Sequence, residues 1–158
     1  MATVELRFTP LPAHVRTARL VAVSLARRAG IDEEVLDEVR LAVGEAATRA
    51  VGRHQVACPG EPVLVRLIDG SGQFVAEVVD RAAEAGPEAD STHIPDLALV
   101  ESIEDDLPPG VDLAVIAGLV DDVSVSAGPD GSVVRMAWAV DESTRNAPSG
   151  YGAPNATA

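Results

Sequence analysis

Two charged side chains on one predicted helix are the first candidates for chemistry in this sequence. Glu45 and Arg49 stand four residues apart in the run from residue 39 to residue 51, so they lie on the same face of that helix. A carboxylate can accept a proton in general-base catalysis, whereas a guanidinium has five donors and no acceptor and therefore cannot bind a metal ion. This spacing, with the acid first, favours an ion pair on the helix surface, and a carboxylate paired in this way is a poorer base. From these residues alone we expect a structural pair rather than a catalytic one.

The other side chains that commonly carry chemistry are scattered. His14, His54 and His93 lie in three separate segments without the spacing of metal ligands, and Cys58 is a single cysteine. These features argue against a metal site and against catalysis by a cysteine–histidine pair. A single cysteine also excludes an internal disulfide and fits a reducing cytoplasm, where we expect the protein to act.

The composition limits the classes of partner. The 158 residues include 12 basic side chains, all of them arginine, and 25 acidic ones, which gives a formal net charge of −13. This balance argues against nucleic-acid binding and is compatible with steering toward a basic protein partner. No apolar run reaches about 18 residues, and the N-terminus has no basic region followed by an apolar stretch, so we expect neither a membrane span nor a signal peptide.

The elements that would position Glu45 and Arg49 follow an α/β order. Alternation of apolar and polar residues predicts strands, apolar residues at helical spacing predict helices, and Asp32 is the expected N-terminal cap of the second helix. The Asp-Gly pair at 69–72 predicts a hairpin. The expected elements are a strand at 4–8, a helix at 14–29 before Gly30, a helix after Asp32, strands at 63–68 and 74–79, a short helix at 97–103, a helix at 113–120, and strands at 123–125 and 133–138.

Two segments lack an apolar face. Residues 81–96 are rich in Ala, Glu, Gly, Pro and Ser, which is typical of a mobile loop. Residues 141–158 have the composition of a disordered tail. We therefore expect one domain over residues 1–140 followed by a tail over residues 141–158.

The run Glu45-Ala46-Ala47-Thr48-Arg49 resembles a known nucleotide-site motif. A glutamate followed by Ala-x-Thr and one further residue is similar to the N box of the GHKL ATPase fold, in the version found in bacterial anti-sigma regulatory factors, which are serine kinases of the switch-protein type. In that family the residue after the threonine is an asparagine that holds the Mg²⁺ of ATP, and the glutamate is the expected general base. Here the asparagine position is Arg49, so the resemblance implies that Glu45 is a vestigial base.

Two further segments resemble the glycine boxes of the same family. Asp80 matches the strand-end aspartate that binds the adenine amino group, but the following glycine positions are Ala82 and Glu84. Gly110 matches the first glycine of the second box, and its second glycine is replaced by Asp112. The resemblance covers residues 6–139 in element order. It implies that Arg49, Asp80, Ala82, Glu84, Gly110 and Asp112 form a degenerate ATP site, in which the added negative charges would repel a polyphosphate.

The resemblance implies a fold and a function. The fold is a two-layer α/β sandwich with a mixed, mostly antiparallel sheet covered on one face by helices. The expected function is that of an anti-sigma-factor-like regulatory protein, a pseudokinase that takes part in partner switching and transcription regulation by binding proteins. No cofactor and no metal are expected. The alternative is an active ATP-dependent protein serine/threonine kinase that uses ATP and Mg²⁺, and a small-molecule sensor using the vacated cavity is a third class.

The partners are implied by the same resemblance. The expected partner is a STAS-domain anti-sigma antagonist, with a sigma factor and a homodimer as further candidates, and neither nucleic acid nor membrane is expected. The residues expected to contact the partner are Arg16, Arg19, Glu45 and Arg49.

Overall fold

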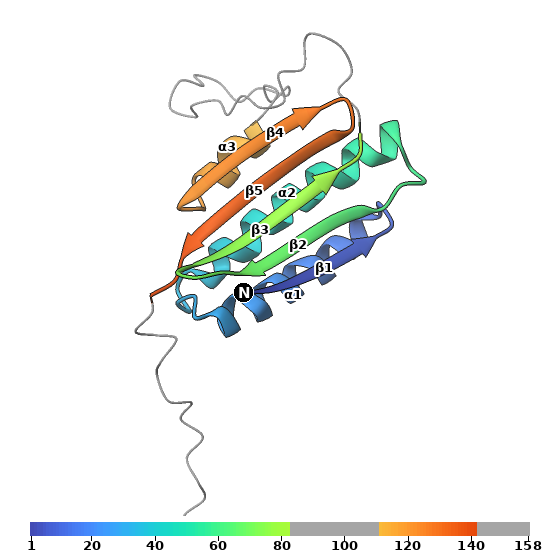
Figure 1. Cartoon of the computed structure of the whole chain (residues 1–158). Coiled ribbons are helices and arrows are strands. Elements are labelled where there is room, and N and C mark those ends of the chain that lie inside the picture. Colours follow the sequence, from blue (N-terminus) through green and yellow to red (C-terminus); the bar gives the residue numbers. More distant parts are fainter. Residues whose placement is uncertain (83–110, 142–158) are drawn as a thin grey trace, which may run out of the picture.

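A five-stranded sheet with helices on one face forms the part of the chain that the computed structural model describes, residues 1–82 and 111–141 (Figure 1). The elements in chain order are β1 (Ala2–Phe8), α1 (Pro12–Ala29), α2 (Leu36–Ala57), β2 (Val63–Asp69), β3 (Gln73–Asp80), α3 (Val111–Ala117), β4 (Asp122–Gly128) and β5 (Gly131–Ala139). The expected two-layer α/β sandwich is confirmed. Its sheet is antiparallel throughout the described strands rather than mixed.

The strand register gives the face that the helices cover an apolar row of side chains, whereas the uncovered face mixes charged residues with apolar ones such as Leu64 and Val75. The strands lie in the order β1-β2-β3-β5-β4. One row of paired residues facing the helices consists of apolar side chains, Leu6, Val65, Val78, Val134 and Val125. The next row, on the uncovered face, is Glu5, Arg66, Glu77, Arg135 and Ser124. Since successive side chains of a strand point to opposite faces, this alternation decides which face the helices cover.

Small side chains allow α1 and α2 to pack closely on the sheet. Ala22 and Ala26 of α1, and Ala42 and Ala46 of α2, are all buried in the core. Helix α1 ends at Gly30, which has a φ of 96°, a left-handed conformation that glycine adopts without steric cost. Helix α2 lies against the sheet, where it carries Arg49 toward α3 and the end of β3.

Several boundaries differ from the sequence predictions. Asp32 does not cap α2, because a turn at residues 33–35 intervenes and the helix begins at Leu36. Helix α3 ends at Ala117, three residues before the predicted end, since Gly118 and Leu119 form a turn. Strand β4 is longer than predicted because its pairing with β5 runs from Asp122 to Gly128.

Other expectations lie outside the described residues. These are the helix at 97–103, almost all of the loop at 81–96, and the tail at 141–158 except its first residue. In the described part of the chain, no helix is both long and apolar enough to cross a membrane.

Candidate functional site

Three of the residues singled out in the sequence come together between α2, α3 and the end of β3. The Arg49 Nε of α2 lies 3.0 Å from Oδ2 of Asp112 in the first turn of α3, and its terminal nitrogen NH1 lies 3.8 Å from Oδ2 of Asp80. The Arg49 side chain is only 10% exposed. Ion pairs at such a site are screened little by solvent, so this arrangement joins α2, α3 and β3 electrostatically.

A second arginine that the sequence analysis missed completes the cluster. Arg53 lies one helical turn beyond Arg49 on α2, and its Nε is 3.2 Å from Oδ2 of Asp80. This contact is an ion pair rather than a hydrogen bond, because the buried Nε has no hydrogen-bond partner among the described residues. The terminal nitrogen of Arg53 donates a hydrogen bond to the backbone oxygen of Ala82 at 3.1 Å. The four-residue spacing from Arg49 is a signal present in the sequence, because it places both guanidinium groups on one face of the helix.

The Asp80 carboxylate is buried and uses both of its oxygens. Oδ1 accepts the backbone N–H of Ala82 at 3.1 Å, and Oδ2 accepts the hydroxyl of Ser132 at 2.6 Å. Asp80 and Ser132 are each 2% exposed, and they are register partners across β3 and β5. The role of Ser132 depends on which strands pair, and that information is not contained in the local pattern around either residue.

Two arginines and two aspartates therefore compensate one another in this cluster. A buried charge is tolerated only when it is paired and hydrogen-bonded, and each of the four side chains has at least one such partner. Asp112 also accepts the backbone N–H of Leu113 at 2.9 Å, which fixes its carboxylate at the start of α3. Asp80, in particular, has no oxygen that lacks a donor from this chain.

Glu45 does not take part in this cluster. Its side chain is partly buried on α2, and within the described residues no ion pair joins it to Arg49, which turns to Asp112 and Asp80 instead. The helix-surface pair expected from the four-residue spacing is therefore wrong. An exposed pair of this kind contributes only about 0.3–0.5 kcal/mol, so Arg49 pairs instead with Asp112 of α3, where water screens the charges less.

The remaining predicted site residues divide into three groups. Ala82 is buried beside Asp80. Glu84 and Gly110 lie outside the described residues. Arg16 and Arg19 lie on α1, where they border a hollow of about 260 Å³ between α1 and α2 that also contains Thr48. The predicted partner-binding residues therefore do not form one surface, because Arg49 is engaged inside the cluster.

A fully buried histidine supports the end of β3. The Nε2 of His54 accepts the backbone N–H of Arg81 at 2.8 Å, and Nδ1 lies 2.8 Å from the backbone oxygen of Glu61. Because an amide N–H can only donate and a carbonyl can only accept, the imidazole must be neutral with its proton on Nδ1. The buried His54 is thus structural. No group of three or more His, Cys, Asp or Glu side chains suited to a metal ion occurs among the described residues.

The comparisons with known proteins agree with this arrangement of helices and strands. The sequence model of the histidine kinase-like ATPase domain matches residues 8–138. The chain belongs to this family. No curated protein matches the chain.

Among solved structures, this histidine kinase-like ATPase domain is similar to the RsbU and RsbW domains of Rv1364c from Mycobacterium tuberculosis. The TM-score is 0.61 at 17% sequence identity, and the match covers 88% of this chain and 32% of that one. The chain thus spans about a third of the length of that protein. At this level of identity the likeness establishes a shared fold.

The single cysteine of this ATPase-like domain lies next to the cluster. Burial raises the pKa of the Cys58 thiol above its usual value, and the negative charges of Asp80 and Glu61 raise it further, while Arg53 acts in the opposite direction. A raised thiol pKa means that less thiolate is present at neutral pH, and the thiolate is the nucleophile.

We therefore expect Cys58 to react slowly with iodoacetamide. In the folded protein, alkylation at pH 7.5 is expected to be at least about tenfold slower than in the urea-unfolded chain, and the pH midpoint of the rate is expected to lie above that of a free thiol. Mass spectrometry over a time course measures both quantities. A folded-state rate equal to the unfolded-state rate would contradict this expectation.

The buried ion pairs predict a large loss of stability when Arg49 is neutralised. Arg49→Met keeps most of the apolar stem but leaves Asp80 and Asp112 with less compensating charge, so we expect it to lower the free energy of unfolding by about 3 kcal/mol. Arg40→Met is the matched control. It removes an exposed pair with Asp37 on the same helix and should cost less than about 1 kcal/mol. Equal losses in urea unfolding would show that the cluster contributes little.

Proposed function

We propose that this protein is an anti-sigma-factor-like regulator that acts by binding proteins, with ATP binding lost or impaired. One observation carries the proposal. The Asp80 carboxylate, which the family resemblance assigns to adenine, is already bound by Ser132, by the Ala82 amide and by the guanidinium group of Arg53. The partners that fit this proposal are a STAS-domain antagonist and a sigma factor.

The chemistry at the other site positions supports the same reading. A magnesium ion bound to ATP needs an oxygen ligand, and Arg49 supplies only donors and a positive charge. Asp112 places an anion where the resemblance expects phosphates, and this anion is paired with Arg49 at 3.0 Å. Freeing Asp80 means breaking its buried pairs with the two arginines at a cost of about 3–5 kcal/mol, against roughly 8 kcal/mol for micromolar binding. The pair between Arg49 and Asp112 adds less, because the Asp112 side chain is 35% exposed.

The alternative is an active ATP-dependent serine kinase. The adjacent guanidinium groups of Arg49 and Arg53 favour this alternative, because two arginines can hold a phosphate without a metal ion. Glu45 would then be the general base. In this case ATP would have to displace Asp80 and Asp112 from both arginines.

Titration calorimetry with Mg-ATP distinguishes the two functions. We expect no binding tighter than about 1 mM, which corresponds to roughly 4 kcal/mol. Arg49→Asn alone is not expected to restore binding, since Asp112 remains and Arg53 still occupies Asp80. A micromolar dissociation constant for the unchanged protein would establish the alternative instead.

The groove between α1 and α2 is the surface we propose for partner docking. The Arg19 guanidinium lies against Gly44, where any side chain would collide with it, and its buried Nε has no hydrogen-bond partner among the described residues. Leu20 and Leu41 are more than half exposed on the same two helices. A partner that presents apolar side chains to these leucines and an acidic group to the hollow bordered by Arg16 and Arg19 would fit this surface.

We expect a STAS-domain antagonist from the same cell to bind without ATP and to remain unphosphorylated. Co-purification tests the complex, and intact-mass analysis after incubation with Mg-ATP tests phosphate transfer. Arg19→Ala should weaken the complex by about tenfold, whereas the exposed Arg28→Ala at the other end of α1 should not. A gain of one phosphate mass on the antagonist would favour the kinase, and failure to bind any STAS protein or sigma factor would refute the regulatory role.

A further inference from the structure

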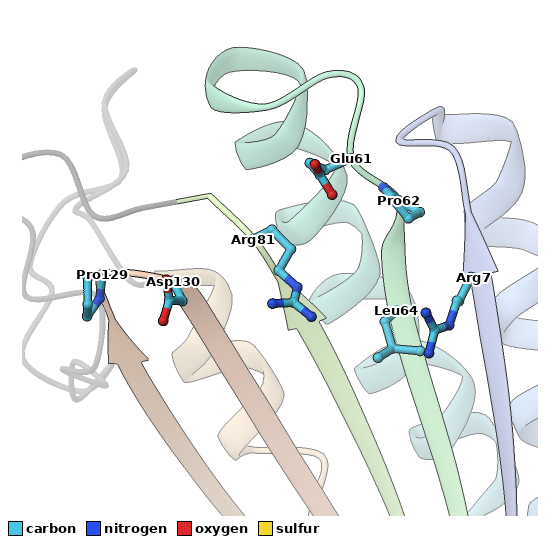
Figure 2. Close-up of a pocket in the computed structure, with 7 residues that line it drawn as sticks. All are labelled: Arg7, Glu61, Pro62, Leu64, Arg81, Pro129 and Asp130. Carbon is cyan, nitrogen blue, oxygen red and sulfur yellow. The ribbon is translucent and has the colours of Figure 1, made fainter.

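The uncovered face of the sheet has a hollow of about 370 Å³ at the end where β3 finishes (Figure 2). Leu64 of β2 and Pro62, which precedes that strand, supply its apolar lining. Arg7 of β1 and Arg81, the first residue after β3, supply two guanidinium groups. In Figure 2 the side chains of Arg81 and Arg7 lie on either side of Leu64. The hollow thus combines an apolar patch with two flanking cations.

The two arginines differ in whether a carboxylate of this protein neutralises their positive charge. Arg7 pairs with Glu5 at 3.1 Å, in a pair whose side chains are 65% and 42% exposed. Arg81 is exposed, and within the described part of the chain no carboxylate lies within ion-pair distance of its guanidinium group. In a protein with a net charge of −13, this cation is available to an external anion.

The buried imidazole of His54 holds two walls of the hollow in place. It accepts the backbone N–H of Arg81 and bonds to the backbone oxygen of Glu61, each at 2.8 Å. Both of these residues line the hollow. One fully buried side chain therefore fixes the relative position of the Arg81 wall and the Glu61–Pro62 wall, so the hollow is organised before any ligand binds.

The charges at the rim select among anions. Two guanidinium groups match either a carboxylate or a phosphate. Glu61 and Asp130 also border the hollow, and Figure 2 shows Glu61 above Arg81 and Asp130 on the side of Arg81 away from Leu64. Their negative charges repel a dianion more strongly than a monoanion, which favours a carboxylate over a phosphate. Leu64, Pro62 and Pro129 favour an apolar group next to that carboxylate.

We propose that Arg7 and Arg81 form a binding site for a carboxylate carried on a short apolar stem, on the uncovered face of the sheet. The site is independent of the Asp80 cluster, because it uses neither Asp80 nor the arginines of α2. The carboxylate belongs either to a free organic acid or to a glutamate side chain of a protein segment. Both sources present the same chemistry to the two guanidinium groups.

The test is a titration followed by NMR of the Leu64 methyl groups and the arginine Nε–H signals. The probes are butyrate, a capped Ala-Glu-Ala peptide and inorganic phosphate, at constant ionic strength. We expect saturable shifts at Leu64, Arg7 and Arg81 with butyrate or with the peptide, and weaker binding of phosphate. Saturation by butyrate identifies a free acid as a sufficient ligand, and saturation by the peptide alone identifies a protein segment.

Matched variants make the test specific. Arg81→Met keeps an apolar stem and removes the charge, and we expect it to weaken binding at least about tenfold. Arg28→Met removes another exposed arginine, on α1, and should leave the affinity unchanged. Three results would overturn the proposal: no saturable shift at 50 mM butyrate or peptide, equal affinity in Arg81→Met, or phosphate binding more tightly than both carboxylates.

Discussion

The buried Asp80 carboxylate is the group on which the arrangement of this domain's candidate site depends. A carboxylate on a residue with 2% exposure needs positive charge and hydrogen-bond donors around it, and three parts of the chain provide them. Helix α2 contributes Arg49 and Arg53, β5 contributes Ser132, and the backbone just after β3 contributes the Ala82 amide. Arg49 then extends the network to Asp112 of α3. The position of α2 on the sheet, the pairing of β3 with β5 and the start of α3 are therefore linked through one carboxylate.

In this histidine kinase-like ATPase fold, the packed core and the charged cluster are stabilised by different interactions. The sheet and the helices pack through a continuous apolar core of mostly valine and alanine side chains, with larger residues such as Phe74 and Trp138. The charged residues of the cluster are stabilised by ion pairs and hydrogen bonds to one another and to nearby backbone groups. Apolar packing of the core and charge pairing in the site contribute separately to the free energy of folding. Residues of the site can therefore change without unfolding the core, provided that the charges remain paired.

The order of strands and helices was predicted from β-rich runs and helical spacing, and the two-layer fold was predicted from the family resemblance. The register then brings Val65, Val78 and Val134 of the predicted strands into one row. The site was predicted less completely. Arg49, Asp80 and Asp112 were recognised through motif positions, whereas Ser132 and His54 act through partners 52 and 27 residues away. A local sequence pattern does not show which distant residue Ser132 or His54 contacts. The Glu45–Arg49 pair failed for the same reason, because a local rule does not include Asp112.

The turn between β4 and β5 shows how closely a surface hairpin can be connected to the interior. Gly131 has a φ of 117°, and a Cβ atom there would overlap the backbone oxygen of Asp80 and crowd the Cα of Arg81. Hairpin turns usually accept substitution and insertion, since they lie outside the core. In this domain the turn instead acts as a stop against which the end of β3 rests. Sequence drift at that exposed corner is therefore restricted by the same geometry that holds the Asp80 carboxylate and the Arg81 guanidinium in place.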